Sequence, residues 1–182
     1  STLARALVGL QPIQNGGVSF MGENFQPNQP DSLQKWRRNV QMILQDPLAS
    51  LSPRQTVLES VIEPLRYLRP DVPESEHKPR ALALLARVGI AQDMVERYPH
   101  EFSGGQRQRI AIARALMLEP SLVVADEPVS ALDVSIQAQV LNLLADLQRD
   151  LGLAYLFISH DLGVVRHIAH DVLVMYLGHT VE

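Results

Sequence analysis

Two consecutive carboxylates, Asp126 and Glu127, directly follow the apolar run of residues 122–125. Two charges at the end of a buried strand are costly unless a cationic group meets them. A magnesium–phosphate group would do so, because Mg²⁺ binds through one or two carboxylates, directly or through water, together with substrate phosphates. The adjacent carboxylate could then act as general base on a water molecule aimed at the γ-phosphorus. The pattern by itself fits equally well with two acids that end a strand or face solvent.

A histidine, His160, follows the next apolar run, residues 155–158. Its imidazole could hydrogen-bond a γ-phosphate oxygen and the attacking water. For a single histidine, a partly buried ring bonded to the backbone is the more frequent arrangement. The other five histidines show no paired spacing of metal ligands and are interpreted as ordinary polar residues: His77, His100, His167, His170 and His179.

The sequence Ser-Gly-Gly-Gln at residues 103–106 leads into a predicted helix. Ser103 and Gln106 have the spacing of a capping box. A helix N-terminus also exposes backbone N–H groups at the positive end of the helix dipole, where phosphate binds well. The two interpretations are compatible, but a cap alone does not need Gly104 and Gly105. The glycine pair therefore favours a phosphate-binding site.

The elements that must position these residues follow from the apolar runs. Strands are predicted at residues 40–44, 122–125, 155–158 and 172–176. A helical stripe over 140–151 and a short helix over 164–168 separate the last three. This order predicts an α/β fold of parallel βαβ units with helices on both faces. Ligands bind such sheets at the carboxyl ends of the strands, where Asp126, Glu127 and His160 fall.

The middle of the chain has a mostly helical pattern instead. We interpret residues 56–118 as an inserted helical subdomain, with residues 1–55 and 119–182 as the core around it. Residues 68–78 are polar and proline-rich, which predicts a surface loop. Four prolines are expected to break the helical stretch into pieces: Pro64, Pro70, Pro73 and Pro79.

Composition excludes several classes of function. The 182 residues, 46% of them hydrophobic, fit one folded domain with an insertion. The net charge of −4 argues against a nucleic-acid partner, and the absence of cysteine excludes disulfides, cysteine zinc sites and thiol nucleophiles. No apolar stretch approaches the ~20 residues that span a bilayer. Any membrane role is therefore expected to come through a partner.

Together these segments resemble the ATP-binding cassette (ABC) ATPases, whose motifs occur here in order. Residues 103–109 resemble the signature motif. The other matches are Gln45 for the Q-loop glutamine, residues 122–127 for Walker B with the catalytic glutamate, residues 130–133 for the D-loop, and His160 for the switch histidine. The resemblance implies a P-loop NTPase (RecA-like) core with an inserted helical subdomain. It also implies ATP and Mg²⁺ as cofactors.

In this family two cassettes sandwich two ATP molecules head to tail. The resemblance implies that Asp126, Gln45, Glu127 and His160 act on one face of each nucleotide. Asp126 and Gln45 would serve Mg²⁺, and Glu127 would be the general base. The signature residues 103–106 would reach the γ-phosphate bound by the other subunit, and Asp133 would line the path between the two sites.

The first residues also fit the family. Ser1 matches the final residue of Walker A, G-x-x-x-x-G-K-S/T, which binds Mg²⁺, and Thr2 the residue after it. The glycines and lysine of that motif are missing, and residues 1–9 have the pattern of a helix already under way. We expect a chain truncated before Ser1 and ending early at Glu182. Without that lysine, the 182 residues alone are then expected to bind Mg-ATP very weakly and to hydrolyse it negligibly. Micromolar affinity in isothermal titration would refute this expectation.

The subfamily is indicated by residues 45–54, 98–102 and 125–139, which resemble ATPases of di- and oligopeptide importers. Glutathione and nickel importers share much of this pattern. The resemblance implies a second cassette, integral membrane permease subunits and, indirectly, a solute-binding protein as partners. It places the protein peripherally at the cytoplasmic face of the inner membrane. The alternative is a soluble ABC ATPase of DNA repair or translation, which the charge and the Q-loop pattern disfavour.

Overall fold

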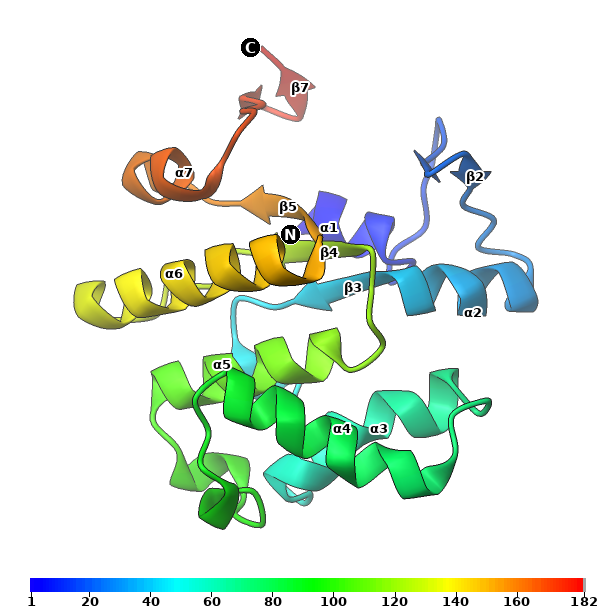
Figure 1. Ribbon diagram of the computed structural model, residues 1–182. Coiled ribbons are helices and arrows are strands. Elements are labelled where there is room, and N and C mark those ends of the chain that lie inside the picture. Colours follow the sequence, from blue (N-terminus) through cyan, green and yellow to red (C-terminus); the bar gives the residue numbers. More distant parts are fainter. Residues whose placement is uncertain (182) are drawn as a thin grey trace.

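Three parallel strands form the sheet at the centre of the fold. Figure 1 shows the computed structural model, which describes residues 1–181. The strands are β3 (Val40–Ile43), β4 (Leu122–Asp126) and β5 (Ala154–Ile158), in the order β3-β4-β5. Both pairings are parallel, and β4 lies between its two neighbours. The predicted α/β architecture is confirmed for these strands.

Successive side chains along β3 and β4 point to opposite faces of the sheet, and each face has its own hydrophobic core. On one face Val124 packs with Ala4 and Val8, which belong to or end α1 (Thr2–Leu7). On the other face Val123 and Ile43 pack with the helices that follow β3 and β4. Figure 1 shows α1 above the sheet and α5 (Gly104–Leu116) below it. Helices therefore cover both faces, as predicted from the order of elements.

A helix that the apolar runs did not indicate, α2 (Pro30–Asn39), leads directly into β3. Its buried Trp36 donates an indole N–H hydrogen bond to the Leu7 carbonyl at 2.8 Å. The Trp36 ring also packs against Phe25, with ring centroids 4.8 Å apart. These contacts join α2 to α1 on the same face of the sheet.

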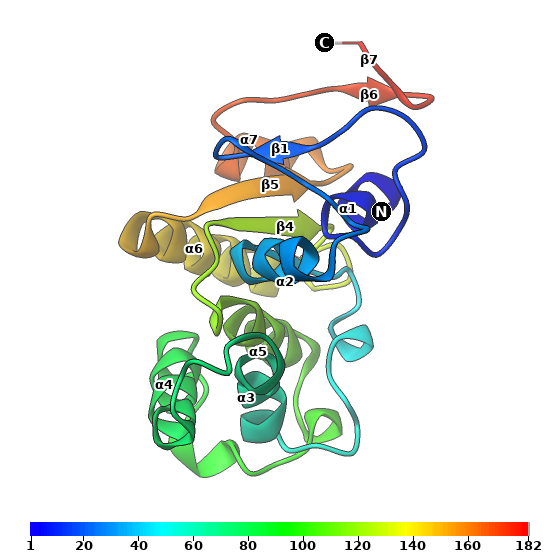
Figure 2. The ribbon, with the colours of Figure 1, turned by 90° about the vertical axis from the view of Figure 1, so that its right-hand side faces the viewer.

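Three helices pack together beside the sheet, as Figure 2 shows: α3 (Val57–Leu68), α4 (Glu74–Arg87) and α5. Thr56 and Glu59 form a capping box at the start of α3. Short 3₁₀ turns, η2 (Gln92–Met94) and η3 (Pro99–Glu101), connect α4 to α5. Most buried apolar residues of all three helices belong to the same core cluster as Val123, so this core is continuous from the helices to the sheet.

The predicted breaks at Pro64 and Pro79 are wrong, because both prolines lie inside helices, α3 and α4. A proline in a helix costs about 3 kcal/mol through its missing N–H and its ring. Burial offsets this cost, since Leu65 of α3 and Leu85 of α4 are fully buried next to these turns. The predicted loop over 68–78 is correspondingly too long. α3 continues to Leu68 and α4 begins at Glu74, which leaves only residues 69–73.

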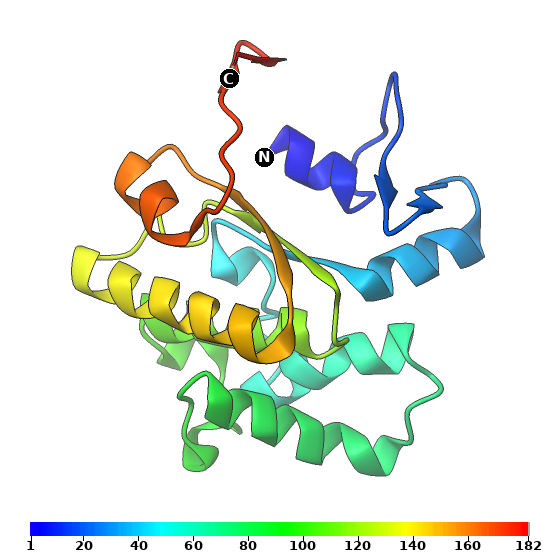
Figure 3. The same cartoon turned by 45° about the horizontal axis from the view of Figure 1, so that its top comes forward.

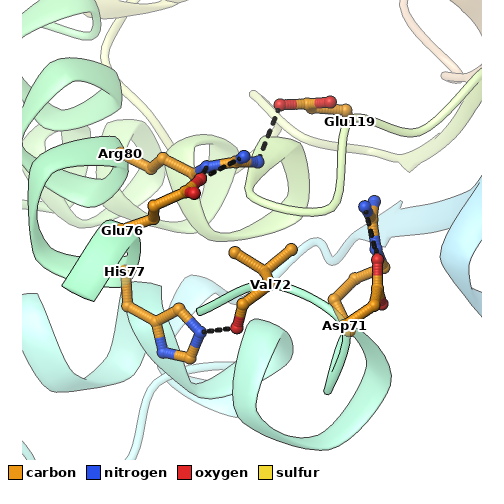
Figure 4. A network of polar contacts seen from close by, with 7 residues as sticks. Asp71, Val72, Glu76, His77, Arg80 and Glu119 are labelled. Carbon is orange, nitrogen blue, oxygen red and sulfur yellow. Dashed lines mark hydrogen bonds and ion pairs between the residues drawn. The ribbon is translucent and has the colours of Figure 1, made fainter. Parts of the chain in front are cut away.

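The 69–73 connection is fastened to α4 by polar contacts (Figure 4). His77 is buried, and its Nε2 donates to the Val72 carbonyl at 3.1 Å. Arg69 bonds Asp71 at 3.0 Å within the connection. Arg80 of α4 pairs with Glu76 on its own helix and with Glu119 beyond α5. His77 thus has a structural role, rather than that of an ordinary surface residue.

The predicted strand over 172–176 is not part of the parallel sheet. Only Met175–Tyr176 (β6) is extended, and it pairs antiparallel with His179–Thr180 (β7). Leu177 and Gly178 between them both have positive φ, 48° and 83°, which is the geometry of a tight two-residue hairpin. The run therefore pairs locally, and Figure 3 shows the hairpin apart from β5.

The remaining elements are short or connect the sheet strands. A second hairpin near the N-terminus pairs β1 (Ser19–Phe20) with β2 (Glu23–Asn24). η1 (Pro47–Ala49) follows β3, α6 (Val134–Leu151) joins β4 to β5, and α7 (Leu162–Ile168) follows β5. Among residues 1–181, no helix is long and apolar enough to cross a bilayer.

One ion pair between α3 and α5 generates a pH-dependent prediction. Arg114 donates to Glu63 at 2.8 Å, and both side chains are about 30% exposed. This hydrogen bond holds the pKa of Glu63 below its usual 4.5. Because a lowered pKa favours the charged form in the folded state, the pair stabilises the fold above pH 4.5 and stops doing so as pH falls through the folded-state pKa.

We expect Glu63→Gln to lower the free energy of unfolding by about 1 kcal/mol near pH 7. The difference from the parent chain should shrink as the pH is lowered below 4.5. Urea denaturation at several pH values measures it. The exposed Glu74→Gln, which loses only a charge at the start of α4, serves as a control with a smaller effect of at most about 0.5 kcal/mol. A difference that is the same at every pH would contradict the assigned role of the Glu63 charge.

Candidate functional site

The carboxyl ends of the three strands bring together one side chain each. Gln45, Glu127 and His160 follow β3, β4 and β5 within two residues. Gln45 Nε2 donates to one Glu127 carboxylate oxygen at 3.2 Å, and His160 Nδ1 lies 3.3 Å from the other. Glu127 is half-buried and His160 is largely exposed. A carboxylate held between an amide and an imidazole can accept a proton from an adjacent water molecule.

The backbone at Glu127 has an unusual conformation. Its φ of +49° lies in the left-handed region, which is unfavourable for a residue with a Cβ by roughly 1–2 kcal/mol. The Glu127 N–H donates to the Ile158 carbonyl at 2.9 Å, and Ser130 Oγ donates back to the Glu127 carbonyl at 3.1 Å. These bonds hold the residue in a turn that projects its carboxylate from the sheet edge. Strain of this kind is often stored at functional sites.

The neighbouring carboxylate, Asp126, ends β4 and is almost completely buried, at 3% exposure. Its Oδ1 meets no hydrogen-bond donor in suitable geometry, and the Ser1 nitrogen lies 3.4 Å away. A buried carboxylate oxygen without a donor fits a cation, so the residues present suit Mg²⁺. Ser1, the N-cap residue of α1, therefore lies at this same edge of the sheet, and Thr2 is the first residue of that helix.

No three histidine, aspartate or glutamate side chains converge on one point within residues 1–181. Such a cluster is not needed for Mg²⁺, which keeps several water ligands and binds through one or two protein groups and substrate phosphates. Asp126, Ser1 and Gln45 are the residues that could supply those protein groups.

The signature residues form a second group at the start of α5. Ser103 Oγ accepts from the Gln106 N–H at 3.3 Å, and Gln106 Oε1 accepts from the Ser103 N–H at 3.0 Å. The predicted capping box is therefore confirmed. The first N–H groups of α5 have no acceptor within the helix, and such an end can bind phosphate. In the part of the chain described, no hydrogen bond or ion pair links residues 103–106 to Gln45, Glu127 or His160.

The two glycines of this group have different surroundings. A Cβ built on Gly105 would lie 2.4 Å from Cγ2 of Ile136, in the first turn of α6, so α5 and α6 can approach this closely only because Gly105 has no side chain. A Cβ on Gly104 would lie 3.5 Å from Leu132, an ordinary contact. Packing against α6 is thus a reason for Gly105 that sequence spacing did not reveal.

The loop between β4 and α6 carries Asp133, the N-cap residue of α6. Its side chain makes no capping hydrogen bond and is exposed, which leaves the carboxylate available to solvent. Gln137 of α6 hydrogen-bonds to this loop: its Nε2 donates to the carbonyls of Val129 and Leu132, both at 3.0 Å. Gln137 was not among the predicted site residues, since no local spacing distinguishes it from a solvent-facing helix residue.

A small hollow of about 70 Å³ lies beside the Glu127 carboxylate. Its walls include Ser130, Gln137, His160 and Asp161. A larger cavity of about 440 Å³ lies elsewhere, between α4, α5 and α6, and has a mainly apolar lining. The polar groups able to act on a phosphate are therefore at the sheet edge and not in this larger, apolar cavity.

A parallel α/β sheet that presents a buried aspartate, a strained glutamate and a glycine-led helix end is characteristic of nucleoside triphosphatases of the P-loop class. Residues 1–130 match the family model described as ABC transporter, and the chain belongs to this family.

The chain is similar to curated importer subunits over all 182 residues. It is 56% identical to the oligopeptide transport ATP-binding protein OppF of Escherichia coli K12, covering 54% of that protein. It is 57% identical to the glutathione import ATP-binding protein GsiA of Escherichia coli O157:H7, covering 29% of it. The chain thus spans about half the length, or less, of the curated relatives it matches.

Two solved structures have the same fold. CbiO1 from Clostridium perfringens, part of the ABC transporter complex cbiONQ, superimposes with a TM-score of 0.87 at 27% identity, over 100% of this chain and 70% of that one. The ATP-binding cassette MJ0796, a dimer bound to ADP and Pi, gives 0.78 at 31% identity, over 91% and 72%. These similarities confirm the P-loop NTPase fold and the ABC resemblance.

The different surroundings of the two glycines predict different effects of alanine. Gly105→Ala should lower the free energy of unfolding by about 1–3 kcal/mol, because a β-branched helix residue such as Ile136 cannot easily rotate its methyl group away. Gly104→Ala should be neutral or stabilising by up to about 1 kcal/mol, since alanine suits a helix better than glycine. Chemical denaturation of both variants measures the difference.

The clash is tested directly by removing its other partner. Ile136→Ala combined with Gly105→Ala should cost less than the sum of the two single changes. Equal stabilities of the two glycine variants, or strictly additive costs, would show that α6 does not constrain Gly105.

Proposed function

We propose that this chain is the ATP-binding and ATP-hydrolysing part of an ABC importer for peptides. One observation carries the proposal: the Glu127 carboxylate lies at the carboxyl edge of the sheet, bonded by Gln45 and next to His160. Full-length similarity to OppF and GsiA supports an importer of peptides or of the peptide glutathione.

In this proposal Glu127 acts as general base on the water that attacks the γ-phosphate. Gln45 orients the carboxylate and serves Mg²⁺, and His160 contacts the γ-phosphate and the attacking water. Asp126, Gln45 and Ser1 hold Mg²⁺, which supplies neutralisation of charge on the phosphate oxygens when bound. The buried Oδ1 of Asp126, which accepts no hydrogen bond and lies 3.4 Å from the Ser1 amino group, supports this assignment.

The second group of residues serves the partner subunit's nucleotide in this proposal. Ser103, Gly104, Gly105 and Gln106 bind the γ-phosphate held by a second cassette, and Asp133 lies between the two sites. The exposed Asp133 side chain and the N-terminus of α5 support this arrangement. The dimeric cassette MJ0796 is a precedent for the assembly.

The remaining partners are those of an importer. The cassettes act on integral membrane permease subunits at the cytoplasmic face of the inner membrane, and a solute-binding protein delivers the peptide from outside. No nucleic acid is involved in this proposal, which the net charge of −4 supports.

Replacing the proposed base tests the catalytic assignment. In the complete gene product assembled with its permease, Glu127→Gln should lower ATP turnover by at least ~100-fold, because the amide cannot accept the proton of water. Binding of Mg-ATP should change by less than about threefold, since the amide keeps the size of the carboxylate. Steady-state phosphate release and a fluorescent ATP analogue measure the two effects.

The exposed Glu74→Gln on α4 is a matched control and should keep full turnover. Unchanged turnover in Glu127→Gln would rule out Glu127 as the base. Purification of the tagged gene product from membranes tests the transport role: an integral membrane permease should accompany it. Ribosomes or DNA in its place would favour the soluble, non-transport class.

A further inference from the structure

The first turn of α6 contacts both groups of proposed site residues. Gln137 holds the loop after Glu127 through the carbonyls of Val129 and Leu132. One residue earlier, Ile136 packs against Gly105 at the start of α5. Adjacent residues of one helical turn therefore connect the catalytic loop with the signature end.

The catalytic loop needs such support because its conformation is strained. Glu127 has positive φ, and the loop is anchored on the sheet side by the bond from Glu127 N–H to the Ile158 carbonyl. At the other end, Asp133 provides no side-chain cap for α6. The two bonds from Gln137 fasten this end of the loop to the helix. A strained conformation persists only where its surroundings fix it.

The bonds of Gln137 also reach the side chains that meet substrate. Ser130 lies between the two clamped residues, donates to the Glu127 carbonyl and is 3.4 Å from Gln45 Nε2. Gln137 itself lines the hollow beside Glu127 and His160. A shift of the loop relative to α6 would therefore change the position of the Glu127 carboxylate and of its partner Gln45.

We propose that Gln137 is a positioning residue: its side-chain amide fixes the loop from Glu127 to Asp133 on α6, so that hydrolysis depends on it without its touching the nucleotide. Through Ile136 and Gly105 the same turn ties the position of Glu127 to the signature end of α5. The inference rests on the proposed ATPase function.

The chemistry of the two bonds makes the test specific. The N–H₂ group of Gln137 donates two hydrogen bonds from one atom, one to each carbonyl, which a carboxylate oxygen in the same position cannot do. A glutamate of the same shape has no donor and would face both carbonyl oxygens with a charge. Two residues further on, Gln139 uses its amide oxygen, which accepts from Arg109 at 3.2 Å. A glutamate there keeps that acceptor, so Gln137→Glu and Gln139→Glu form a matched pair on one helix.

We expect Gln137→Glu to lower kcat of the permease-assembled gene product by about 10- to 100-fold, with the KM for ATP changed less than about threefold. Gln139→Glu should stay within about twofold of the parent. Gln137→Met, which removes the donors without adding charge, should lose turnover to an intermediate degree. It also carries the test if the glutamate variant does not fold.

Hydrogen exchange measures the clamp independently of ATP turnover. Amides of residues 129–133 should exchange faster in both Gln137 variants and unchanged in Gln139→Glu. Wild-type kcat in Gln137→Met, equal losses in the matched pair, or unchanged exchange at 129–133 would each overturn the proposal. A parent protein without ATP turnover would refute the proposed function. The exchange measurement would then still test whether the Gln137 side chain holds residues 129–133 in place.

Discussion

Hydrogen bonding along both edges of β4 fixes the relative positions of the residues that follow β3, β4 and β5. β3 pairs with this strand in parallel register from Leu122 to Ala125, and β5 pairs with it from Leu122 to Asp126. Bonds beyond the strand extend the pairing, since Ser121 donates to the Asn39 carbonyl and accepts from Ala154. The carboxyl ends of all three strands are therefore aligned. Residues placed just after them must meet, which is how one amide, one carboxylate and one imidazole come together from distant parts of the chain.

The same strand also joins the two hydrophobic cores. Val124 faces the core built by α1 and α2, and Val123 faces the core that continues through α3, α4, α5 and α6. Asp126 is buried at the end of this strand, where a lone charge is costly. The fold can support that cost because β4 is apolar and fully packed on both faces. Sheet pairing and burial thus place a buried carboxylate oxygen, 3.4 Å from the Ser1 amino group, where a cation can reach it.

Much of this arrangement could be predicted from the sequence because the signals are local. Apolar runs followed by polar residues located β3, β4 and β5, and the capping box of Ser103 and Gln106 follows from spacing alone. The errors share a different cause. Pro64 and Pro79 are tolerated in helices because of tertiary burial. Within residues 172–176, only Met175 and Tyr176 form a strand, and they pair in a hairpin because of the backbone geometry at Leu177 and Gly178. Propensity and periodicity contain neither kind of information.

Gly104 and Gly105 differ in a way that their sequence positions do not reveal. Gly104 and Gly105 look equivalent in a motif, and both suit a helix end that binds phosphate. Only the packing of α6 separates them, because Ile136 leaves no space for a side chain at Gly105. The residue that follows Ile136 holds the loop of Glu127. A residue required for close packing therefore lies between the signature end and the Glu127 carboxylate. Since the first turn of α6 contacts both groups, a shift of one group relative to the other requires this turn to repack or to lose the two hydrogen bonds of Gln137.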